Sequence, residues 1–298
     1  MAKKYLTNDE KMEILSKSSR FTSKQLAQEY GCSVSEVCKI WRENDFHKPI
    51  GFQYYVDDHY FSSINSATKA YIIGLIASDG NVYKHDGHKG QLRISLKAEN
   101  GEEKLLKEIL RDMNATHPIT QIKRNNSTYI SFTIVSQQIF DDLQNIGIIE
   151  NKTWDMDIAK VISRIPHKYY KDFFRGYFDG DGSVSNLEPG KPSGVRVRIS
   201  CTLNSANTFI DALKRIGISA SFIPDKRKYK HGFGTLSFTG YNKYIFLKLL
   251  YDNNNICLER KKVNATRYFN LVETNITNRR ENIIAVNKYS EFLNETHN

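Results

Sequence analysis

Two aspartates, Asp79 and Asp181, are the residues whose type and spacing best suit chemistry. Each lies at the end of a near-copy of one apolar stretch and is followed by glycine, in Ile72–Gly80 and in Phe174–Gly182. Two carboxylates that lie close together repel each other unless a proton or a cation lies between them. Mg²⁺ or Mn²⁺ takes such oxygen ligands and activates water for phosphodiester hydrolysis. The pair therefore predicts a divalent-metal site that cuts a phosphodiester.

The elements that must position these acids are two apolar helices, predicted at about 66–79 and 167–180. Small residues recur at four-residue spacing in both helices: Gly74 with Ser78, and Gly176 with Gly180. This spacing places the small residues on one helix face, so two backbones can approach closely. If the helices pack side by side, their C-terminal ends bring the two aspartates together.

The hydrophobic pattern that follows each helix is also duplicated. It predicts strands near 81–85, 91–98, 118–124 and 128–135, then near 183–185, 194–203, 219–228 and 233–239. Further helices are predicted near 102–113, 137–145, 206–216 and 241–252. We therefore expect an α+β fold with two pseudo-symmetric αββαββα repeats, 59–160 and 161–270. Each repeat has a four-stranded antiparallel sheet, and a linker from Asn151 to Ile165 joins the repeats.

One face of each predicted sheet is polar and basic. Arg93, Ser95 and Lys97 alternate with apolar residues in the first copy, and Arg196 and Arg198 do so in the second. The apolar face is expected to pack on helices and the basic face to meet solvent. Such a ribbon can lie in a DNA major groove and contact phosphates and base edges. The expected DNA-binding residues of the sheets are Arg93, Ser95, Lys97, Lys123, Arg196 and Arg198.

Residues 1–46 are predicted to form a small all-α module. Three capping-box patterns mark helix starts: Thr7 with Glu10, Thr22 with Gln25, and Ser33 with Glu36. The second helix, about 22–30, carries Leu26, Ala27 and Tyr30 inward, and the third, about 34–43, carries Val34, Val37, Ile40 and Trp41. Gly31 falls where a positive φ is needed.

The spacing of these residues is similar to that of a helix-turn-helix, in which the last helix contacts DNA. On that interpretation Ser35, Lys39 and Arg42 face DNA. A generic three-helix bundle with no DNA role is the alternative. Residues 47–58 are expected to form a linker, and 271–298 a polar C-terminal tail.

The bulk composition indicates a nucleic-acid partner. The formal charge is +10 and the pI is about 9.2, which favours a polyanion. The four cysteines form no CxxC pair, so neither a zinc site nor a disulfide framework is expected, which fits a reducing cytoplasm. No apolar run reaches the roughly 18 residues of a membrane span, and no membrane association is expected.

The two apolar stretches resemble the LAGLIDADG motif of homing endonucleases in their single-chain, two-repeat form. The resemblance covers about residues 54–270 and includes the αββαββα order of both halves. It implies saddle-shaped sheets on a long pseudo-palindromic double-stranded DNA site, cleavage of both strands across the minor groove, and a monomer. It also implies Asp79 and Asp181 as catalytic, metal-binding acids, with Gly80 and Gly182 at the same metal sites.

The family also places a basic residue and a polar residue near each active site. Lys152 and Lys261 match the basic residue by location, and Glu99 and Asn204 match the polar residue that contacts the water network. The sixth motif position is Ala77 in the first copy and Asp179 in the second. Because this position is structural or capping in the family, we expect the departure to weaken capping more than catalysis.

Two other functions remain open on the same fold. An intron maturase would use the basic sheets to bind intron RNA and would not need both acids. A DNA-binding regulator with an inactive core would be expected to have lost an acid, and both are present. Site-specific double-strand DNA cleavage is the leading prediction.

Overall fold

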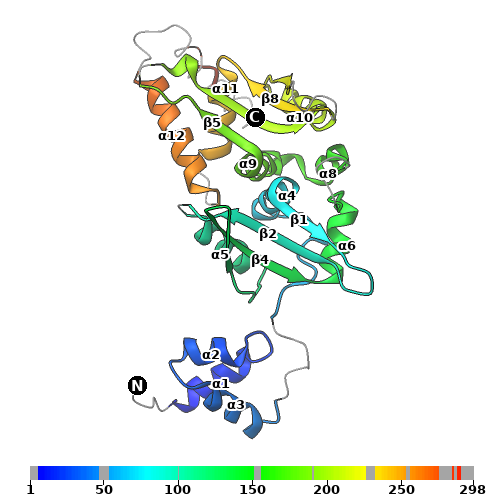
Figure 1. Ribbon diagram of the computed structural model, residues 1–298, viewed down its shortest axis with the longest axis vertical. Helices are drawn as coiled ribbons and strands as arrows, with labels where there is room; N and C mark the ends of the chain where they lie inside the picture. The colour runs from blue at the N-terminus through cyan, green and yellow to red at the C-terminus, as the bar shows by residue number, and fades with distance from the viewer. Residues whose placement is uncertain are drawn as a thin grey trace.

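The computed structural model describes residues 6–46, 54–99, 101–150, 156–189, 191–225, 232–252, 256–274, 284 and 287–289. Figure 1 shows a small helical module beside a larger unit in which two sheets lie on either side of a central pair of helices, α4 and α9. Within the described residues, no helix is long and apolar enough to cross a membrane.

The N-terminal module contains three helices, α1 (Asn8–Lys17), α2 (Ser23–Glu29) and α3 (Val34–Glu43). Thr7 and Thr22 form reciprocal capping boxes, and Ser33 accepts a hydrogen bond from the Glu36 N–H. Gly31 has a φ of +63°, as the turn requires. Leu26, Ala27, Tyr30, Val37 and Ile40 form a core with Ile14. The prediction for Val34 is wrong, because its side chain is 44% exposed at the start of α3.

The first repeat contains the predicted helices and strands in the predicted order. These are α4 (Ala67–Asp79), β1 (Gly80–Tyr83), β2 (Gln91–Lys97), α5 (Glu102–Asp112), β3 (Thr120–Arg124), β4 (Ser127–Val135) and α6 (Gln137–Ile146). The sheet order is β1-β2-β4-β3, with every neighbouring pair antiparallel.

The second repeat has the same order. It consists of α9 (Tyr170–Asp181), β5 (Gly182–Ser185), β6 (Arg196–Thr202), α10 (Leu203–Arg215), β7 (Ser221–Pro224), β8 (Phe233–Phe238) and α11 (Asn242–Tyr251). Short 3₁₀ turns, η1 (His167–Tyr169) and η2 (Pro192–Gly194), precede α9 and β6. The sheet order is β5-β6-β8-β7, which matches the first sheet and confirms the α+β fold of two repeats.

Two helices lie where none was predicted. Helix α8 (Ile158–Arg164) is in the expected linker, where Asp157 caps it and Ile158, Val161 and Ile162 are buried. Helix α12 (Glu259–Glu273) follows α11 and extends past the expected end of the second repeat. In Figure 1, α12 runs from the second repeat toward α5 of the first. Helix α8 has only seven residues, too few for a clear helical period, and the apolar positions of α12 lie among charged and polar residues.

The two repeats share one continuous core. Buried apolar residues of both sheets and of α4, α9, α11 and α12 belong to a single cluster, separate from that of the N-terminal module. Helices α4 and α9 cross this core side by side (Figure 1). Because both helices are almost wholly buried, their geometry fixes the position of one repeat relative to the other.

Strand pairing assigns the side chains to the two faces of each sheet. Arg93, Ser95 and Lys97 lie directly opposite Thr133, Ser131 and Tyr129 of β4, and directly opposed residues share a face. Leu92, Ile94 and Leu96 are buried on the other face. Lys123 pairs with Thr128, and its neighbour Gln121 pairs with the buried Ile130. Lys123 therefore lies on the helix-covered face, contrary to the expectation that it joins Arg93, and Arg124 lies on the open face instead.

Candidate active site

Two glycines bring α4 and α9 into direct backbone contact. A Cβ on Gly74 would lie 2.1 Å from the carbonyl oxygen of Phe173, and a Cβ on Gly176 would lie 1.9 Å from that of Tyr71. No side chain fits at such distances. The spacing of small residues read from the sequence thus coincides with the closest approach of the two helices.

The ends of the same helices bring the two acids toward each other. A Cβ on Gly180 would lie 2.1 Å from the Ser78 hydroxyl oxygen and 3.1 Å from the carboxyl carbon of Asp79. Asp79 therefore packs against the residue that precedes Asp181. Asp79 is exposed and Asp181 is half-buried, so both carboxylates lie at the surface end of the helix pair.

Gly80 and Gly182 are needed for space. Both have extended backbone, with φ of −72° and −83°, which any residue can adopt. A Cβ on Gly80 would lie 2.7 Å from the Cα of Ile76, and one on Gly182 would lie 2.3 Å from the ring of Phe178. In each repeat the backbone passes from helix to strand while packed against the last turn of that helix. This close packing sets the direction of the adjacent aspartate.

The two carboxylates act on the same neighbouring groups. Burial raises the pKa of Tyr177 well above its ordinary value, and the charges of Asp181 and Asp79 raise it further. Lys261 is also within reach of both acids: burial lowers its pKa to about 8, while Asp179, Asp79 and Asp181 oppose that change. Tyr177 of α9 and Lys261 of α12 thus both lie in the electrostatic field of the two aspartates. A cavity of about 130 Å³ lies beside Asp181.

Lys261 lies in the first turn of α12, and its ammonium donates to the carbonyl oxygen of Gly182. Its side chain is buried over the ring of Phe178, 5.7 Å from the ring centre. The structure therefore places Lys261 beside the second motif. Its expected counterpart, Lys152, lies outside the described residues.

Asp179, at the sixth motif position, is wholly buried and holds α12 in place. It accepts hydrogen bonds from the Tyr71 hydroxyl at 2.7 Å, the Tyr251 hydroxyl at 2.5 Å and the backbone N–H of Leu258 at 2.7 Å. Burial raises the pKa of Asp179 to about 6, and these three hydrogen bonds oppose that rise. Leu258 is the N-cap residue of α12, so Asp179 ties α9 to the helix that carries Lys261.

The buried side chain of Arg175 also holds the start of α12 in place. This residue was not singled out from the sequence. Arg175 donates to Asp172 at 2.8 Å and to the backbone oxygen of Ile256 at 2.9 Å. It thereby fixes the segment that leads into α12. The signal was present: an arginine stands inside an apolar helix, with an aspartate three residues earlier. The first copy has Ala70 and Ile73 at these positions, so the network belongs to the second repeat.

The two polar candidates, Glu99 and Asn204, are not placed alike. Glu99 forms ion pairs with Lys97 at 2.9 Å and with Arg260 of α12 at 3.5 Å. These partners and Lys261 lower the pKa of Glu99, the Lys97 hydrogen bond most of all. Asn204 lies exposed in the first turn of α10. Glu99 therefore links the first repeat to α12. Among the described residues, Asn204 makes no such link between the second repeat and another element.

The donors at the helix ends fit a hard divalent cation. The two carboxylates and the Gly80 carbonyl supply only oxygen, whereas the Gly182 carbonyl already accepts a hydrogen bond from the Lys261 ammonium. Across the described part of the chain, no three His, Cys, Asp or Glu side chains converge on a possible metal position. A metal here would therefore keep several waters, as Mg²⁺ commonly does.

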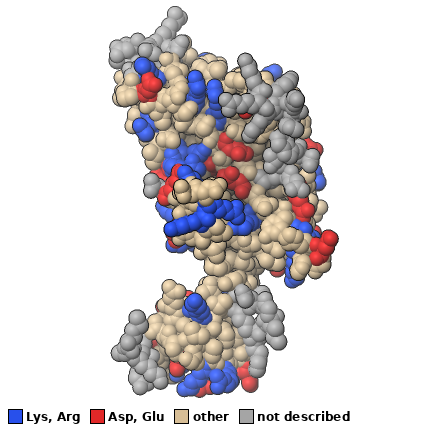
Figure 2. Space-filling view, in the orientation of Figure 1, with Lys and Arg blue, Asp and Glu red and all other residues tan. Residues whose placement is uncertain are grey.

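The open sheet faces extend on both sides of the acids. Figure 2 shows acidic side chains gathered near the centre of the larger unit, with lysine and arginine side chains above and below them. Arg93 and Arg198 lie on the open faces of β2 and β6, flanked by the exposed Lys97 and Arg196. Basic side chains of both sheets therefore lie on their open faces, as the alternation in the sequence predicts.

The N-terminal module presents its own basic surface. Ser35, Lys39 and Arg42 are exposed on α3, although Lys39 lies 3.8 Å from Glu43. The module contacts the first repeat through Thr116, whose hydroxyl donates to the Arg20 carbonyl and whose own carbonyl accepts from Gln25, both at 2.8 Å.

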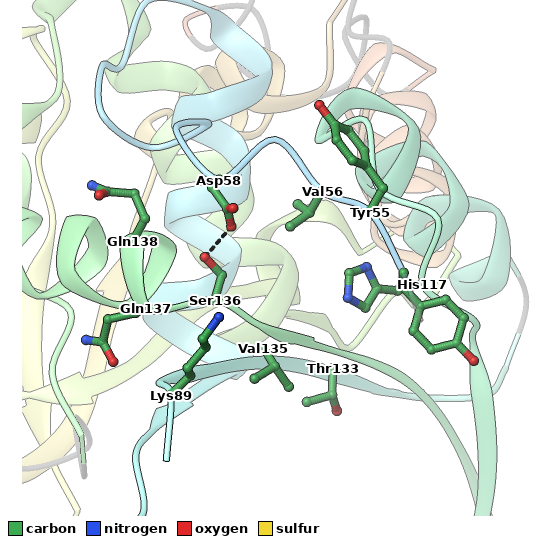
Figure 3. Close-up of a pocket in the computed structure, with 11 residues that line it drawn as sticks. Tyr55, Val56, Asp58, Lys89, His117, Thr133, Val135, Ser136, Gln137 and Gln138 are labelled. Carbon is green, nitrogen blue, oxygen red and sulfur yellow. Dashed lines mark hydrogen bonds between the residues drawn. The ribbon is translucent and has the colours of Figure 1, made fainter. Parts of the chain in front are cut away.

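A further cavity lies away from the acids. It has a volume of about 750 Å³ and lies at the outer end of the first sheet, between Thr133, Val135 and the chain that enters from the N-terminal module. In Figure 3, Lys89 extends toward Ser136, whose hydroxyl donates to Asp58. Neither motif aspartate lines it, as expected if the functional surface is the open pair of sheets.

Comparison with known proteins agrees with this geometry. Residues 168–251 match the family model described as a LAGLIDADG-like domain. The homing endonuclease I-WcaI bound to its DNA recognition sequence has the same fold, with a TM-score of 0.50, 14% identity, and coverage of 72% of this chain and 95% of that chain. The structure of I-DmoI with DNA and Ca is also similar, with a TM-score of 0.47, 18% identity, and coverage of 66% and 96%. No curated protein matches this chain in sequence.

Proposed function

We propose that this protein is a site-specific double-strand DNA endonuclease, because residues 168–251 match the model of a LAGLIDADG-like domain and the chain shares the fold of a homing endonuclease. The observation that carries the proposal is the convergence of Asp79 and Asp181 at the surface end of the α4–α9 pair, between two sheets whose open faces carry arginine and lysine.

Each motif aspartate would serve one strand of the duplex. Asp79 with the Gly80 carbonyl, together with Asp181, would hold Mg²⁺ or Mn²⁺, while the Gly182 carbonyl stays with the Lys261 ammonium. When bound, the metal supplies an activated water and neutralises charge on the scissile phosphate. The tight helix-to-strand turns at the two glycines fix the direction of each carboxylate.

Lys261 would stabilise negative charge on the phosphate near the second motif. Its position depends on α12, which Asp179 and Arg175 tie to α9 and to the preceding segment. Lys152 would serve the first motif. The open sheet faces would bind a long pseudo-palindromic DNA site, and α3 of the N-terminal module would add contacts outside it.

Incubation with a randomised double-stranded DNA library and Mg²⁺, followed by sequencing of the cut ends, tests the proposal. A defined site with both strands cut is expected, and EDTA should abolish cutting. If no ends are cut while a defined sequence is enriched from the same library by binding, the protein is a DNA-binding regulator and the nuclease assignment is overturned.

Asp79→Asn and Asp181→Asn test the two acids separately. Each substitution should convert double-strand cleavage into nicking. Cleavage of the affected strand should slow by roughly 100-fold or more, since a metal contributes several kcal/mol to the transition state. DNA affinity should remain nearly unchanged, and Asp211→Asn on the exposed face of α10 is the matched control. Full-rate double-strand cleavage by the Asp181→Asn variant would contradict a two-acid mechanism.

A further inference from the structure

Arg93 and Arg198 occupy equivalent positions in the two sheets. Gly80 pairs with Ile94 and Gly182 pairs with Ile199, so each arginine lies on the central strand one residue before the partner of its motif glycine. The two guanidinium groups are therefore related by the same pseudo-twofold relation as the two motif aspartates. Whatever one of them contacts in one half of a DNA site, the other can contact in the other half.

The side chains around each arginine are short and polar. Arg93 lies between Asn81 and Thr133 on the neighbouring strands. Arg198 lies between Ser183 and Ser237. Each guanidinium is thus the longest group at its place on the open face, and none of its cross-strand neighbours carries a charge that would repel or neutralise it.

Both arginines have hydrogen-bonding capacity that the protein leaves unused. The Nε of Arg93 and the Nε of Arg198 are buried and have no hydrogen-bond partner among the described residues. Because an atom without solvent exposure cannot reach a DNA base, a base contact falls to the Nη1 and Nη2 nitrogens of each side chain. By contrast, Lys97 on the same strand as Arg93 is paired with Glu99 at 2.9 Å.

We propose that Arg93 and Arg198 each read a guanine in the major groove, through its O6 and N7 atoms, at equivalent positions of the two half-sites. A planar fork of donors matches these two acceptors. The same fork can hold a phosphate, so the base profiles of lysine variants distinguish the two contacts. The proposal rests on the proposed function and adds a feature of the substrate. The DNA site carries G·C pairs at equal distances from its centre, with the guanines on opposite strands.

The two contacts differ in strength. Arg93 donates from Nη2 to the Ser131 hydroxyl at 3.2 Å, whereas no described residue accepts a hydrogen bond from Arg198. A guanidinium that is already held loses less conformational freedom when it binds. The preference for guanine over other bases should therefore be stronger in the half-site that Arg93 contacts than in the half-site that Arg198 contacts.

The test compares lysine substitutions, which keep the charge and remove the fork. Wild type, Arg93→Lys, Arg198→Lys and, as control, Lys104→Gln on the exposed surface of α5 are each profiled on the randomised library with Mg²⁺. The wild-type profile should show the two symmetric G·C pairs. Arg93→Lys should relax preference at one of them by about ten- to a hundredfold, and Arg198→Lys at the other by less. The control profile should equal that of wild type.

The results distinguish a guanine contact from a phosphate contact and from the absence of site selection. If both lysine variants keep the wild-type base profile, or relax all positions equally, the arginines contact phosphate and the proposal fails while the nuclease stands. If wild type selects no site at all, the proposed function fails first. Thermal unfolding of each variant shows whether it is folded. A variant that is unfolded is replaced by Arg→Gln at the same position, which must give the same single-position relaxation.

Discussion

At the scale of single residues, buried charge distinguishes the ends of the two motif helices. Asp179 is wholly buried and keeps three hydrogen-bond donors, because a buried carboxylate is costly unless its lost water is replaced. One of these donors is the N-cap amide of α12, so the carboxylate positions Lys261 indirectly. Ala77 offers no such acceptor in the first copy. We expect the two strands of the DNA site to be cut at different rates for this reason.

His117, in the cavity of Figure 3, predicts a pH dependence of stability. Burial lowers its pKa below the ordinary 6.5, while the nearby Tyr55 backbone and the charge of Asp58 oppose that change. The unfolded chain therefore binds a proton at this site more readily than the folded chain does. Stability should fall as the pH drops from about 6.5 through the lowered pKa.

The measurement is urea unfolding of wild type and of His117→Gln between pH 7 and pH 5. The variant should lose less stability over this range than wild type does. His88→Gln, in the exposed β1–β2 turn, is the control and should follow wild type. Equal pH slopes for wild type and His117→Gln would exclude this residue as the cause.

At the scale of elements, the α4–α9 contact determines whether the two acids meet. Backbone contact at Gly74 and Gly176 leaves no space for a methyl group. Close packing of this kind cannot relax at one point without moving a helix. Lys261 depends similarly on α12, whose start is fixed from the second repeat by Asp179 and from the first by an Arg260–Glu102 contact at 3.0 Å.

Gly176→Ala should separate the helices. The added Cβ would lie 1.9 Å from the Tyr71 carbonyl oxygen, so we expect a loss of about 1–3 kcal/mol or more in the free energy of unfolding, with cleavage more impaired than DNA binding. Gly194→Ala, where a Cβ meets nothing within 4 Å, should change stability by less than about 0.5 kcal/mol. Equal denaturation midpoints for the two variants would show that the helices can move apart without cost.

At the scale of the whole molecule, a unit with two pseudo-symmetric sheets carries a separate small module. The module has its own core and meets the larger unit at Thr116 through hydrogen bonds to Arg20 and Gln25. Its distance from the motif aspartates is therefore held by specific contacts. DNA contacts made by α3 should extend the site at one end only.

Deletion of residues 1–46 should weaken DNA binding by roughly tenfold or more, because several phosphate contacts are lost. The cut position should not change, since the two aspartates and both sheets remain. Binding titrations at several salt concentrations and sequencing of the cut ends measure the two effects. The slope of log affinity against log salt should be shallower for the truncated chain, and a shifted cut position would contradict an accessory role. Lys39→Gln in the full chain should give a smaller loss of the same kind.

The sequence alone determined the duplicated order of helices and strands, the alternation of Arg93 and Arg198 with buried residues, and the caps at Thr7 and Thr22. These features depend on periodicity and on local hydrogen bonds, which neighbouring residues fix. Only the tertiary structure decided that Arg175 and Asp179 hold α12, that α8 and α12 are helical, and that Lys123 faces away from Arg93. These depend on contacts between segments far apart in the chain and on strand register, in which a shift of one residue reverses every side chain.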